Sequence, residues 1–365
     1  MSSTLLFGVN LDDPWRYAGL REPKSIIFPH LISIGLPESK ILDTIDEFVA
    51  KLHGDSEEKS QDIPAILSLA DMLADLKIDF VRCWFPWNFF EREAGEMKEL
   101  NKWQDASYNE YPLDNLVETL TRKGISVVPV VACGYQRMLP KGLNPDSAPN
   151  EYIKRGYFHT RLLVRHYKKF IHTWQIENEP NWWHMHTVAG WRSGAVWLEG
   201  AFAEELLGML NDAVHEEDPD ATTIINLEAD KQDLNVIKYS KYCDRIGLDF
   251  YPNYRLAYPI NVSILSRAEA IYKETGKEVI ISETGYPSGP SILGYNEQRQ
   301  AEYVRSACSS ALSMDHVKAI AIWRYRDSTW RSFPEQENYF GLLDTYERPK
   351  IAWRAYSDII HTNRR

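Results

Sequence analysis

The amino-acid sequence predicts an α/β protein built as a single (β/α)8 barrel. Eight apolar segments with strand character are each followed by a segment with helical spacing. Some strand segments, such as 125–132 (ISVVPVVA), are apolar throughout, which is typical of parallel strands buried on both faces. The length of 365 residues suits one barrel with an insertion.

An open, doubly wound sheet is the main alternative for alternating strands and helices. Nucleotide-binding sheets of that kind carry a glycine-rich turn after the first strand. This sequence has no G-x-G-x-x-G motif there and no Walker loop. No change of composition and no Pro/Gly/Ser-rich linker divides the chain, so we expect one domain over 1–365.

The first half of the chain contains four of the expected strands and one interruption. We expect strands at 5–10, 80–84, 125–132 and 174–179, and helices at 62–76, 113–122 and 151–170. The first of these helices has Asp62 as its N-cap and Pro64 in its first turn. Between the first strand and this helix, residues 18–61 break the alternation. We expect an inserted segment there, either a lid or rim of the site or a surface element.

The second half keeps the alternation without interruption. We expect strands at 222–227, 245–250, 278–282 and 318–323. The expected helices are 193–215, 232–242, 260–275, 296–313 and 350–360. Because strands separated by helices must pair in parallel, all their carboxyl ends should meet at one face of the barrel.

The charge balance narrows the range of partners. The chain carries 41 Lys and Arg residues against 52 Asp and Glu residues, a net charge of -11. This disfavours nucleic acid and anionic membranes and suits a neutral ligand. No segment approaches the roughly 18 apolar residues of a membrane span. No leader precedes the first strand, so we expect a cytoplasmic protein, although a secreted form without its leader would look the same.

Aromatic residues are abundant, whereas metal-binding patterns are absent from the sequence. The 12 Trp, 20 Tyr and 13 Phe either fill a large core or stack on the apolar faces of sugar rings. The four cysteines show no C-x-x-C spacing, and the histidines show neither H-x-x-x-H nor H-E-x-x-H. We therefore expect buried free thiols and no metal or cofactor. The composition does not predict the oligomeric state.

Two glutamates stand at the ends of two expected strands. The run Trp174 to Pro180 (WQIENEP) places Glu179 at the end of the fourth strand, and the run 278–287 (EVIISETGYP) places Glu283 at the end of the seventh. In a parallel barrel both side chains would face the mouth, where a sugar could lie between them. Two carboxyl groups on either side of a glycosidic bond are what acid/base and nucleophilic chemistry on that bond requires.

Glu177 competes with Glu179 for the role at the fourth strand. Because side chains alternate along a strand, residues two apart point the same way. We favour Glu179, since it lies at the very end of the strand, and we expect Glu177 to make a structural pair deeper in the barrel.

The N-E-P sequence closing the fourth strand, with a second glutamate closing the seventh, resembles clan A of the retaining (β/α)8 glycoside hydrolases, which includes families 5, 17, 39 and 53. The resemblance covers nearly the whole chain. It implies Glu179 as acid/base, Glu283 as nucleophile and Asn178 as a hydrogen-bond partner of the sugar 2-hydroxyl. Arg82 and Tyr251 resemble the clan's arginine and tyrosine beside the nucleophile. Trp323 resembles the floor of the -1 subsite.

The family within the clan is less defined. The segment 281–288 (ISETGYPS) is similar to the family 17 signature, but has tyrosine where that family usually has tryptophan. The sixth strand ends in Asp249-Phe250-Tyr251, without the H-x-Y of family 5. Further side chains after strand ends are candidates for lining the cleft: Trp87, Trp182, Trp183 and Asp327.

These observations predict a retaining glycosidase that cleaves a β-glycosidic bond by double displacement. The expected substrate is an oligosaccharide or glycoside of β-glucan, β-mannan or β-galactan type. Three alternatives remain open: a transglycosylase using the same glutamates, a non-catalytic glycan-binding barrel, and a (β/α)8 enzyme of another kind.

Overall fold

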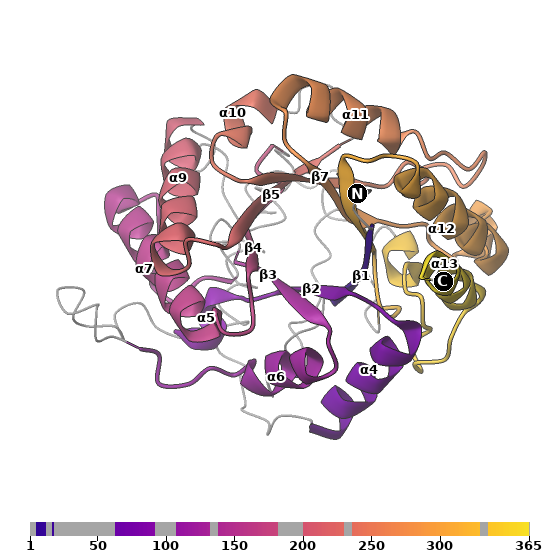
Figure 1. Cartoon of the computed structure of the whole chain (residues 1–365), viewed down its shortest axis with the longest axis horizontal. Helices are drawn as coiled ribbons and strands as arrows, with labels where there is room; N and C mark the ends of the chain where they lie inside the picture. The colour runs from indigo at the N-terminus through magenta and orange to yellow at the C-terminus, as the bar shows by residue number, and fades with distance from the viewer. Residues whose placement is uncertain are drawn as a thin grey trace, which may run out of the picture.

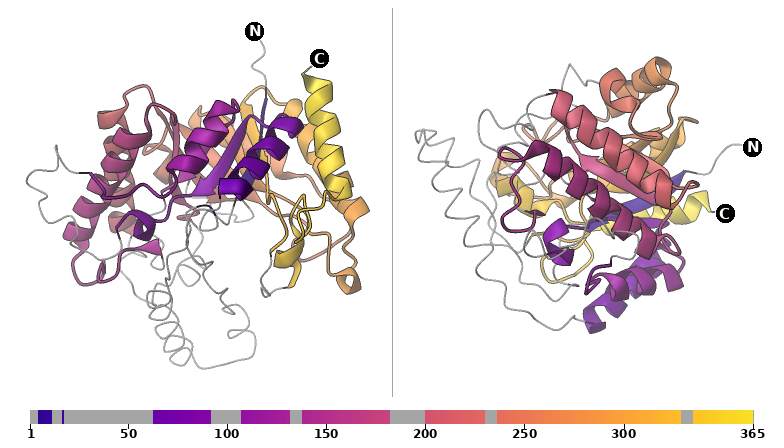
Figure 2. Two further views of the ribbon diagram at one scale, coloured as in Figure 1. Left: turned by 90° about the horizontal axis from the view of Figure 1, so that it is seen from below. Right: turned by 90° about the vertical axis from the view of Figure 1, so that its left-hand side faces the viewer.

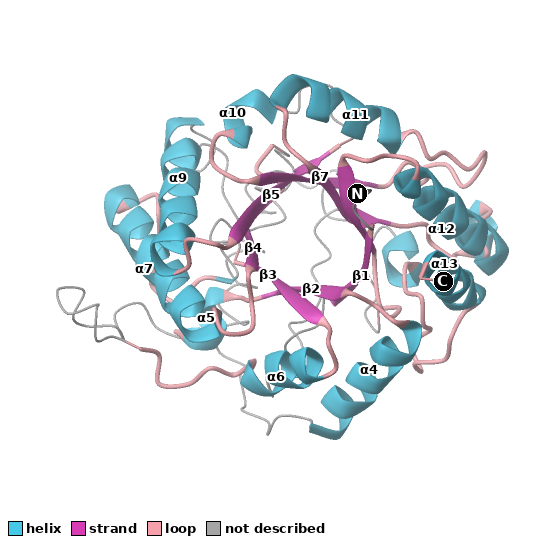
Figure 3. Cartoon of the chain, in the orientation of Figure 1, coloured by secondary structure: helices cyan, strands magenta, loops and turns pink. Residues whose placement is uncertain are grey.

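Eight parallel strands close into a barrel in the order β1-β2-β3-β4-β5-β6-β7-β8. The computed structural model describes residues 5–11, 17, 63–91, 107–131, 138–181, 200–229, 236–328 and 335–364. The strands form the central ring and the helices surround it (Figure 1), as the colouring by secondary structure makes plain (Figure 3). The predicted (β/α)8 fold is confirmed. The inserted segment 18–61 lies outside the described residues, and the expectation of a single domain stays a prediction.

The strands lie close to where the sequence predicts them. They are β1 (Leu6–Leu11), β2 (Phe80–Trp84), β3 (Ser126–Val130), β4 (Thr173–Asn178), β5 (Thr222–Glu228), β6 (Arg245–Phe250), β7 (Val279–Thr284) and β8 (Val317–Ile322). Two ends differ from the prediction in a way that bears on the site. Glu179 is the first residue after β4, and Glu283 lies within β7, because that strand continues two residues beyond the expected end.

The described helices run alongside the strands, as the side views show (Figure 2). They are α4 (Ile63–Leu76), α5 (Trp87–Phe90), α6 (Asp114–Arg122), α7 (Pro149–Tyr167), α9 (Gly200–Glu217), α10 (Val236–Ser240), α11 (Ile264–Thr275), α12 (Glu297–Leu312) and α13 (Ile351–Asn363), with short 3-10 turns η4 (Ser291–Leu293) and η5 (Glu335–Tyr339). The short helix α5 was not predicted. No helix in the described ranges is long and apolar enough to cross a bilayer.

The interior of the barrel changes from apolar to polar along the strands. A small apolar cluster inside the barrel includes Phe80, Ile224 and Ile280. Two residues further along the same strands come Arg82, Asn226 and Ser282, all of them buried. Since residues two apart on a strand face the same side, these polar side chains also point inward. The carboxyl ends of the strands therefore enclose a polar interior.

Close packing at the apolar end of the barrel interior explains why position 8 is a glycine. A Cβ atom added to Gly8 of β1 would lie 2.3 Å from the Phe80 ring of the neighbouring strand. Only glycine leaves room for this ring inside the barrel. The large core between the strands and the outer helices is a second, separate apolar cluster, and it contributes no side chain to the polar interior.

Candidate active site

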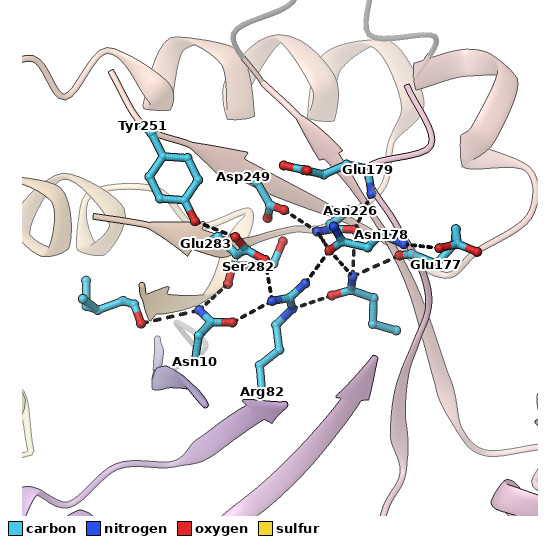
Figure 4. A network of polar contacts seen from close by, with 12 residues as sticks. Asn10, Arg82, Glu177, Asn178, Glu179, Asn226, Asp249, Tyr251, Ser282 and Glu283 are labelled. Atoms are coloured by element: carbon cyan, nitrogen blue, oxygen red, sulfur yellow. Dashed lines mark hydrogen bonds and ion pairs between the residues drawn. The ribbon is translucent and has the colours of Figure 1, made fainter. Parts of the chain in front are cut away.

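Arg82 of β2 is the centre of the polar interior (Figure 4). Its guanidinium donates four hydrogen bonds to side chains of three other strands. The acceptors are Asn10 Oδ1 at 2.7 Å, Gln175 Oε1 at 2.6 Å, Asn178 Oδ1 at 2.7 Å and Glu283 Oε1 at 2.6 Å. Burial opposes the charge of Arg82, but nearby Glu283 and Asp249 outweigh it, so the pKa of Arg82 is raised. The site therefore contains a permanent positive charge.

Glu283 is held at both carboxylate oxygens. Oε1 accepts from Arg82, and the Tyr251 hydroxyl donates to Oε2 at 2.5 Å. The side chains of Arg82 and Glu283 are only 2% and 8% exposed. Burial and the charge of Glu283 raise the pKa of Tyr251 well above its usual value, so the hydroxyl remains a donor. These contacts fix the orientation of a carboxylate that projects from the carboxyl end of β7.

Three side-chain amides connect the arginine to the fourth and fifth strands. Asn178 Oδ1 accepts from Arg82, from Gln175 Nε2 at 3.2 Å and from Asn226 Nδ2 at 2.8 Å. The guanidinium of Arg82 can only donate, so the Asn178 amide atom that faces it is the oxygen and the other is the Nδ2 nitrogen. Any hydrogen bond from this side chain to a ligand must therefore come from its Nδ2 group.

Glu179 leaves the strand direction in a left-handed turn. Its φ is 47°, a backbone conformation that residues other than glycine rarely adopt. Asn226 supports the turn, because its Oδ1 and its carbonyl oxygen both accept from the Glu179 N–H, at 3.0 and 3.2 Å. Asn181 and the backbone of Glu228 exchange two further hydrogen bonds of 3.0 Å. The turn therefore directs the Glu179 side chain across the mouth of the barrel.

The structure corrects the argument about Glu177. A register shift between Gln175 and Glu177 interrupts the alternation of β4, so Gln175 and Asn178 both face Arg82. Glu177 is fully buried and turns away from the arginine, with its Oε1 accepting from the Asn178 N–H at 2.9 Å (Figure 4). Glu177 and Glu179 do not point the same way, because a bulge and a left-handed turn separate them.

The surroundings of Glu179 favour its protonated form. The residue is 7% exposed. Burial, followed by the negative charges of Asp249, Glu283 and Glu228, raises its pKa well above the usual value. A buried carboxyl group next to other carboxylates takes up a proton more readily than one in water. The interior thus contains one carboxyl group, Glu283, that is paired with an arginine and one, Glu179, whose pKa is raised.

The remaining predicted residues divide into three groups. Trp323 follows β8 directly. Its backbone N–H donates to the carbonyl oxygen of Thr284 on β7 at 2.8 Å. Trp87 and Asp327 are both held in packed contacts. Trp87 is 1% exposed and stacks on His159 at 4.6 Å, while Asp327 is 6% exposed and pairs with the Lys350 ammonium at 2.6 Å. Trp182 and Trp183 lie outside the described residues.

Several members of the network were missed at the level of sequence. Each is a polar residue at an inward-facing position of an otherwise apolar strand, which was the available signal. They are Asn10, Gln175, Asn226 and Asp249. The described residues contain no group of three His, Cys, Asp or Glu side chains that could bind a metal ion.

Replacing Arg82 by alanine should destabilise the protein by about 3–5 kcal/mol, because it leaves the buried Glu283 carboxylate without its cation. Urea unfolding followed by circular dichroism measures this change. Lys273→Ala is the matched control, since it removes an exposed partner of Glu269 on α11 and should leave the unfolding free energy nearly unchanged. Equal midpoints for the wild type and both variants would contradict a central role for Arg82.

Comparison with known proteins gives structural relatives only. No family model and no curated protein sequence matches the chain. Among solved structures, GH5_18 from Streptomyces cattleya in complex with GlcNAc is 17% identical with a TM-score of 0.68, covering 100% of this chain and 81% of that one. A β-glucosidase from Thermotoga maritima in complex with azafagomine is 14% identical with a TM-score of 0.63, covering 100% and 99%.

An exo-β-1,4-mannosidase, Op5Man5 from Opitutaceae bacterium strain TAV5, is also similar. It is 14% identical with a TM-score of 0.62, and the alignment covers 99% of this chain and 60% of the mannosidase. All three alignments extend over essentially the whole length of this chain. The chain therefore has the (β/α)8 barrel fold that is found in these glycoside hydrolases.

Proposed function

We propose that this protein is a retaining glycoside hydrolase in which Glu283 is the nucleophile and Glu179 the acid/base. One observation carries the proposal. Two carboxyl groups stand at the carboxyl ends of β4 and β7, and their surroundings differ: Arg82 and Tyr251 hold Glu283 as an oriented carboxylate, whereas Glu179 lies among negative charges that keep it protonated. Retaining hydrolysis requires this division between the two groups.

In the first step, a Glu283 oxygen bonds to the anomeric carbon while the bond from that carbon to the leaving oxygen breaks. The Glu179 proton passes to the leaving oxygen. In the second step, water gives a proton to Glu179 and attacks the anomeric carbon, which releases Glu283. Forming the glycosyl ester removes the negative charge of Glu283, one of the causes that raise the pKa of Glu179. Glu179 therefore becomes easier to deprotonate when it must act as the base.

Asn178 is placed to hold the sugar next to the nucleophile. Its Oδ1 is occupied by Arg82, Gln175 and Asn226. We propose that its Nδ2 group donates to the sugar 2-hydroxyl, a contact that strengthens in the transition state. The rigid amide network keeps this donor in place before the substrate arrives.

The substrate that we propose is a short β-linked oligosaccharide or glycoside of glucose or mannose, with galactose as a third candidate. The net charge of -11 suits a neutral sugar. The similar structures include one described as an exo-β-1,4-mannosidase, one described as a β-glucosidase, and GH5_18 bound to Manβ1-4GlcNAc. These descriptions guide the choice of test compounds.

A 2-deoxy-2-fluoro glycosyl fluoride should label Glu283 covalently, because the 2-fluorine slows both oxocarbenium-like steps while the good fluoride leaving group offsets this for the first step only, so that the glycosyl-enzyme accumulates. A panel of aryl β-glucosides, β-mannosides and β-galactosides first identifies the sugar. Mass spectrometry of the labelled protein then locates the modified peptide. Glu283→Gln should remain unlabelled.

Hydrolysis of the panel with the label at another residue would refute the assignment of the nucleophile. Sugar binding without turnover of any panel member would favour a glycan-binding barrel. Transfer of the glycosyl group to added oligosaccharide, in preference to water, would identify a transglycosylase.

A further inference from the structure

The side-chain amide of Asn226 on β5 forms four hydrogen bonds inside the barrel, and the two-glutamate mechanism gives it no role. Its Oδ1 accepts from Gln175 Nε2 at 2.7 Å and from the Glu179 backbone N–H at 3.0 Å. Its Nδ2 donates to Asn178 Oδ1 at 2.8 Å and to Asp249 Oδ2. An asparagine side chain can make two hydrogen bonds through each end. Asn226 is 0% exposed, and all four of these positions are filled.

Groups of fixed polarity determine how this amide is oriented. A backbone N–H can only donate, so the Asn226 atom that faces the Glu179 nitrogen is the oxygen. At the other end, Asn226 meets the Asn178 oxygen, which also accepts from the Arg82 guanidinium at 2.7 Å (Figure 4). Turning the amide by 180° would place oxygen against oxygen at Asn178 and donor against donor at Glu179. Only one orientation is therefore compatible with its neighbours.

The left-handed turn at Glu179 depends on Asn226 twice. The Glu179 N–H donates to the side-chain oxygen of Asn226 at 3.0 Å and to its carbonyl oxygen at 3.2 Å. A φ of 47° is costly for a residue with a side chain and persists only where surrounding contacts hold it. Removing the Asn226 side chain would leave the N–H with the longer of these two hydrogen bonds. The turn should then relax.

The same amide holds Asn178, to which the proposed function assigns the contact with the sugar 2-hydroxyl. Asn178 is the last residue of β4 and Glu179 is the first residue after that strand. Asn226 reaches both from β5, through its Nδ2 and its Oδ1 respectively. A displacement of this one side chain would therefore move both residues.

The neighbouring strand β6 keeps Asn226 in place. Asp249 on that strand accepts from Asn226 Nδ2 through its buried carboxyl group. Gly247, two residues earlier, pairs with Asn226 across the two strands. A Cβ atom added to Gly247 would lie 2.7 Å from the Asn226 Cβ and 2.6 Å from Ser282 Oγ. Glycine at position 247 thus leaves the space that the Asn226 side chain occupies.

We propose that Asn226 is a positioning residue, whose amide holds the acid/base Glu179 and the sugar-binding Asn178 in a fixed relation to each other. The inference rests on the proposed function, because the roles of these two partners come from it. Asn226 acts through them and not on the sugar.

This role predicts an effect that depends on the leaving group. When the Glu179 turn relaxes, protonation of the leaving oxygen becomes less effective, whereas a leaving group that departs without a proton is insensitive to this change. The weakened contact of Asn178 with the 2-hydroxyl affects all substrates alike. A merely structural role of Asn226 would instead reduce the amount of active protein, by the same factor for every substrate.

Asn226→Ala tests the inference with aryl glycosides of graded leaving-group pKa. Its kcat/KM for the phenyl glycoside should fall further than that for the dinitrophenyl glycoside, by a factor of about 10 to 100. The plot of log kcat/KM against leaving-group pKa should therefore be steeper than in the wild type. The burst of dinitrophenolate from a 2-deoxy-2-fluoro glycoside measures the concentration of active sites. An unchanged slope would overturn the inference.

Thr223→Val is the matched control on the same strand. The buried Thr223 hydroxyl donates to Asn211 Oδ1 on α9 at 2.7 Å, outside the polar interior. The substitution removes a buried hydrogen bond from β5 and should lower the stability without changing the slope. An equal steepening in Thr223→Val would also overturn the inference, because any loosening of β5 would then have the same effect as loss of Asn226.

A crystal structure of Asn226→Ala provides a readout that needs no activity. The φ of Glu179 should leave the left-handed region, and Asn178 should shift with it. An unchanged φ at Glu179 would refute the inference, even if Glu283 labelling supports the proposed function. Absence of that labelling would instead refute the proposed function, whatever the φ of Glu179 in this variant.

Hydrogen exchange in the wild type provides a test that does not depend on a folded variant. Both Nδ2 protons of Asn226 are buried and bound, so they should exchange with solvent far more slowly than those of the exposed Asn261. NMR of the nitrogen-15 labelled protein measures both rates. Equally fast exchange at the two residues would refute the inference, because the amide would then not be held in place.

Discussion

Replacing Glu283 by alanine should lower kcat/KM by at least about 10⁴-fold, because it removes the carboxylate that we propose forms the covalent intermediate. Glu283 is oriented by two hydrogen bonds, from Arg82 and Tyr251, and alanine loses both the carboxylate and this orientation. Aryl glycoside hydrolysis measures the loss, and thermal unfolding followed by circular dichroism checks that the variant is folded.

Azide distinguishes a missing nucleophile from general damage to the site. In Glu283→Ala, azide fills the space that the carboxylate leaves, attacks the anomeric carbon directly and should slowly give the glycosyl azide of inverted configuration. Proton NMR of the product reads the configuration. Hydrolysis by this variant at a rate near that of the wild type would refute the assignment.

Replacing Glu179 by alanine should affect substrates according to their leaving groups. A poor leaving group needs the acid, so kcat/KM for a methyl or phenyl glycoside should fall by about 10²–10⁴-fold. A dinitrophenyl leaving group departs without a proton, so its kcat/KM should fall by less than about 10-fold. A series of aryl glycosides with graded leaving-group pKa measures the difference as the slope of log kcat/KM.

Azide also provides the control for Glu179. It attacks the glycosyl-enzyme without needing a base, so it should accelerate turnover of Glu179→Ala and give the azide of retained configuration. Equal losses for good and poor leaving groups would contradict the acid role. Inverted product from this variant, with retained product from Glu283→Ala, would mean that the two roles are exchanged.

Most of the fold could be predicted from local pattern. The strands β2 and β6 lie at the predicted residues, because an apolar run bounded by turn or polar residues leaves little choice of ends. The end of β7 was placed two residues early, since Glu283 and Thr284 look like turn residues in isolation. They continue the strand because both side chains find hydrogen-bond partners in the barrel: Glu283 accepts from Arg82 and Tyr251, and Thr284 Oγ1 donates to the Phe250 carbonyl.

The sequence alone also located the principal candidates of the site. Glu283 follows from strand order, because the carboxyl ends of parallel strands must meet at one face, whereas Arg82, Asn178 and Tyr251 follow from the resemblance to clan A. The structure brings these four side chains into one hydrogen-bonded cluster. For Trp87, by contrast, the position after a strand end does not reveal that its buried ring packs against His159.

The tertiary structure alone decided the directions of Glu177 and Glu179 and the involvement of Asp249. Alternation predicts that Glu177 and Glu179 point the same way. The bulge in β4 and the φ of 47° at Glu179 turn them apart, and both features involve contacts with β5. Asp249 joins the network because pairing of β5 with β6 places it beside Asn226, whose Nδ2 group donates to the Asp249 Oδ2 atom. Periodicity records which face of a strand a residue occupies, whereas the charges that set its protonation come from other strands.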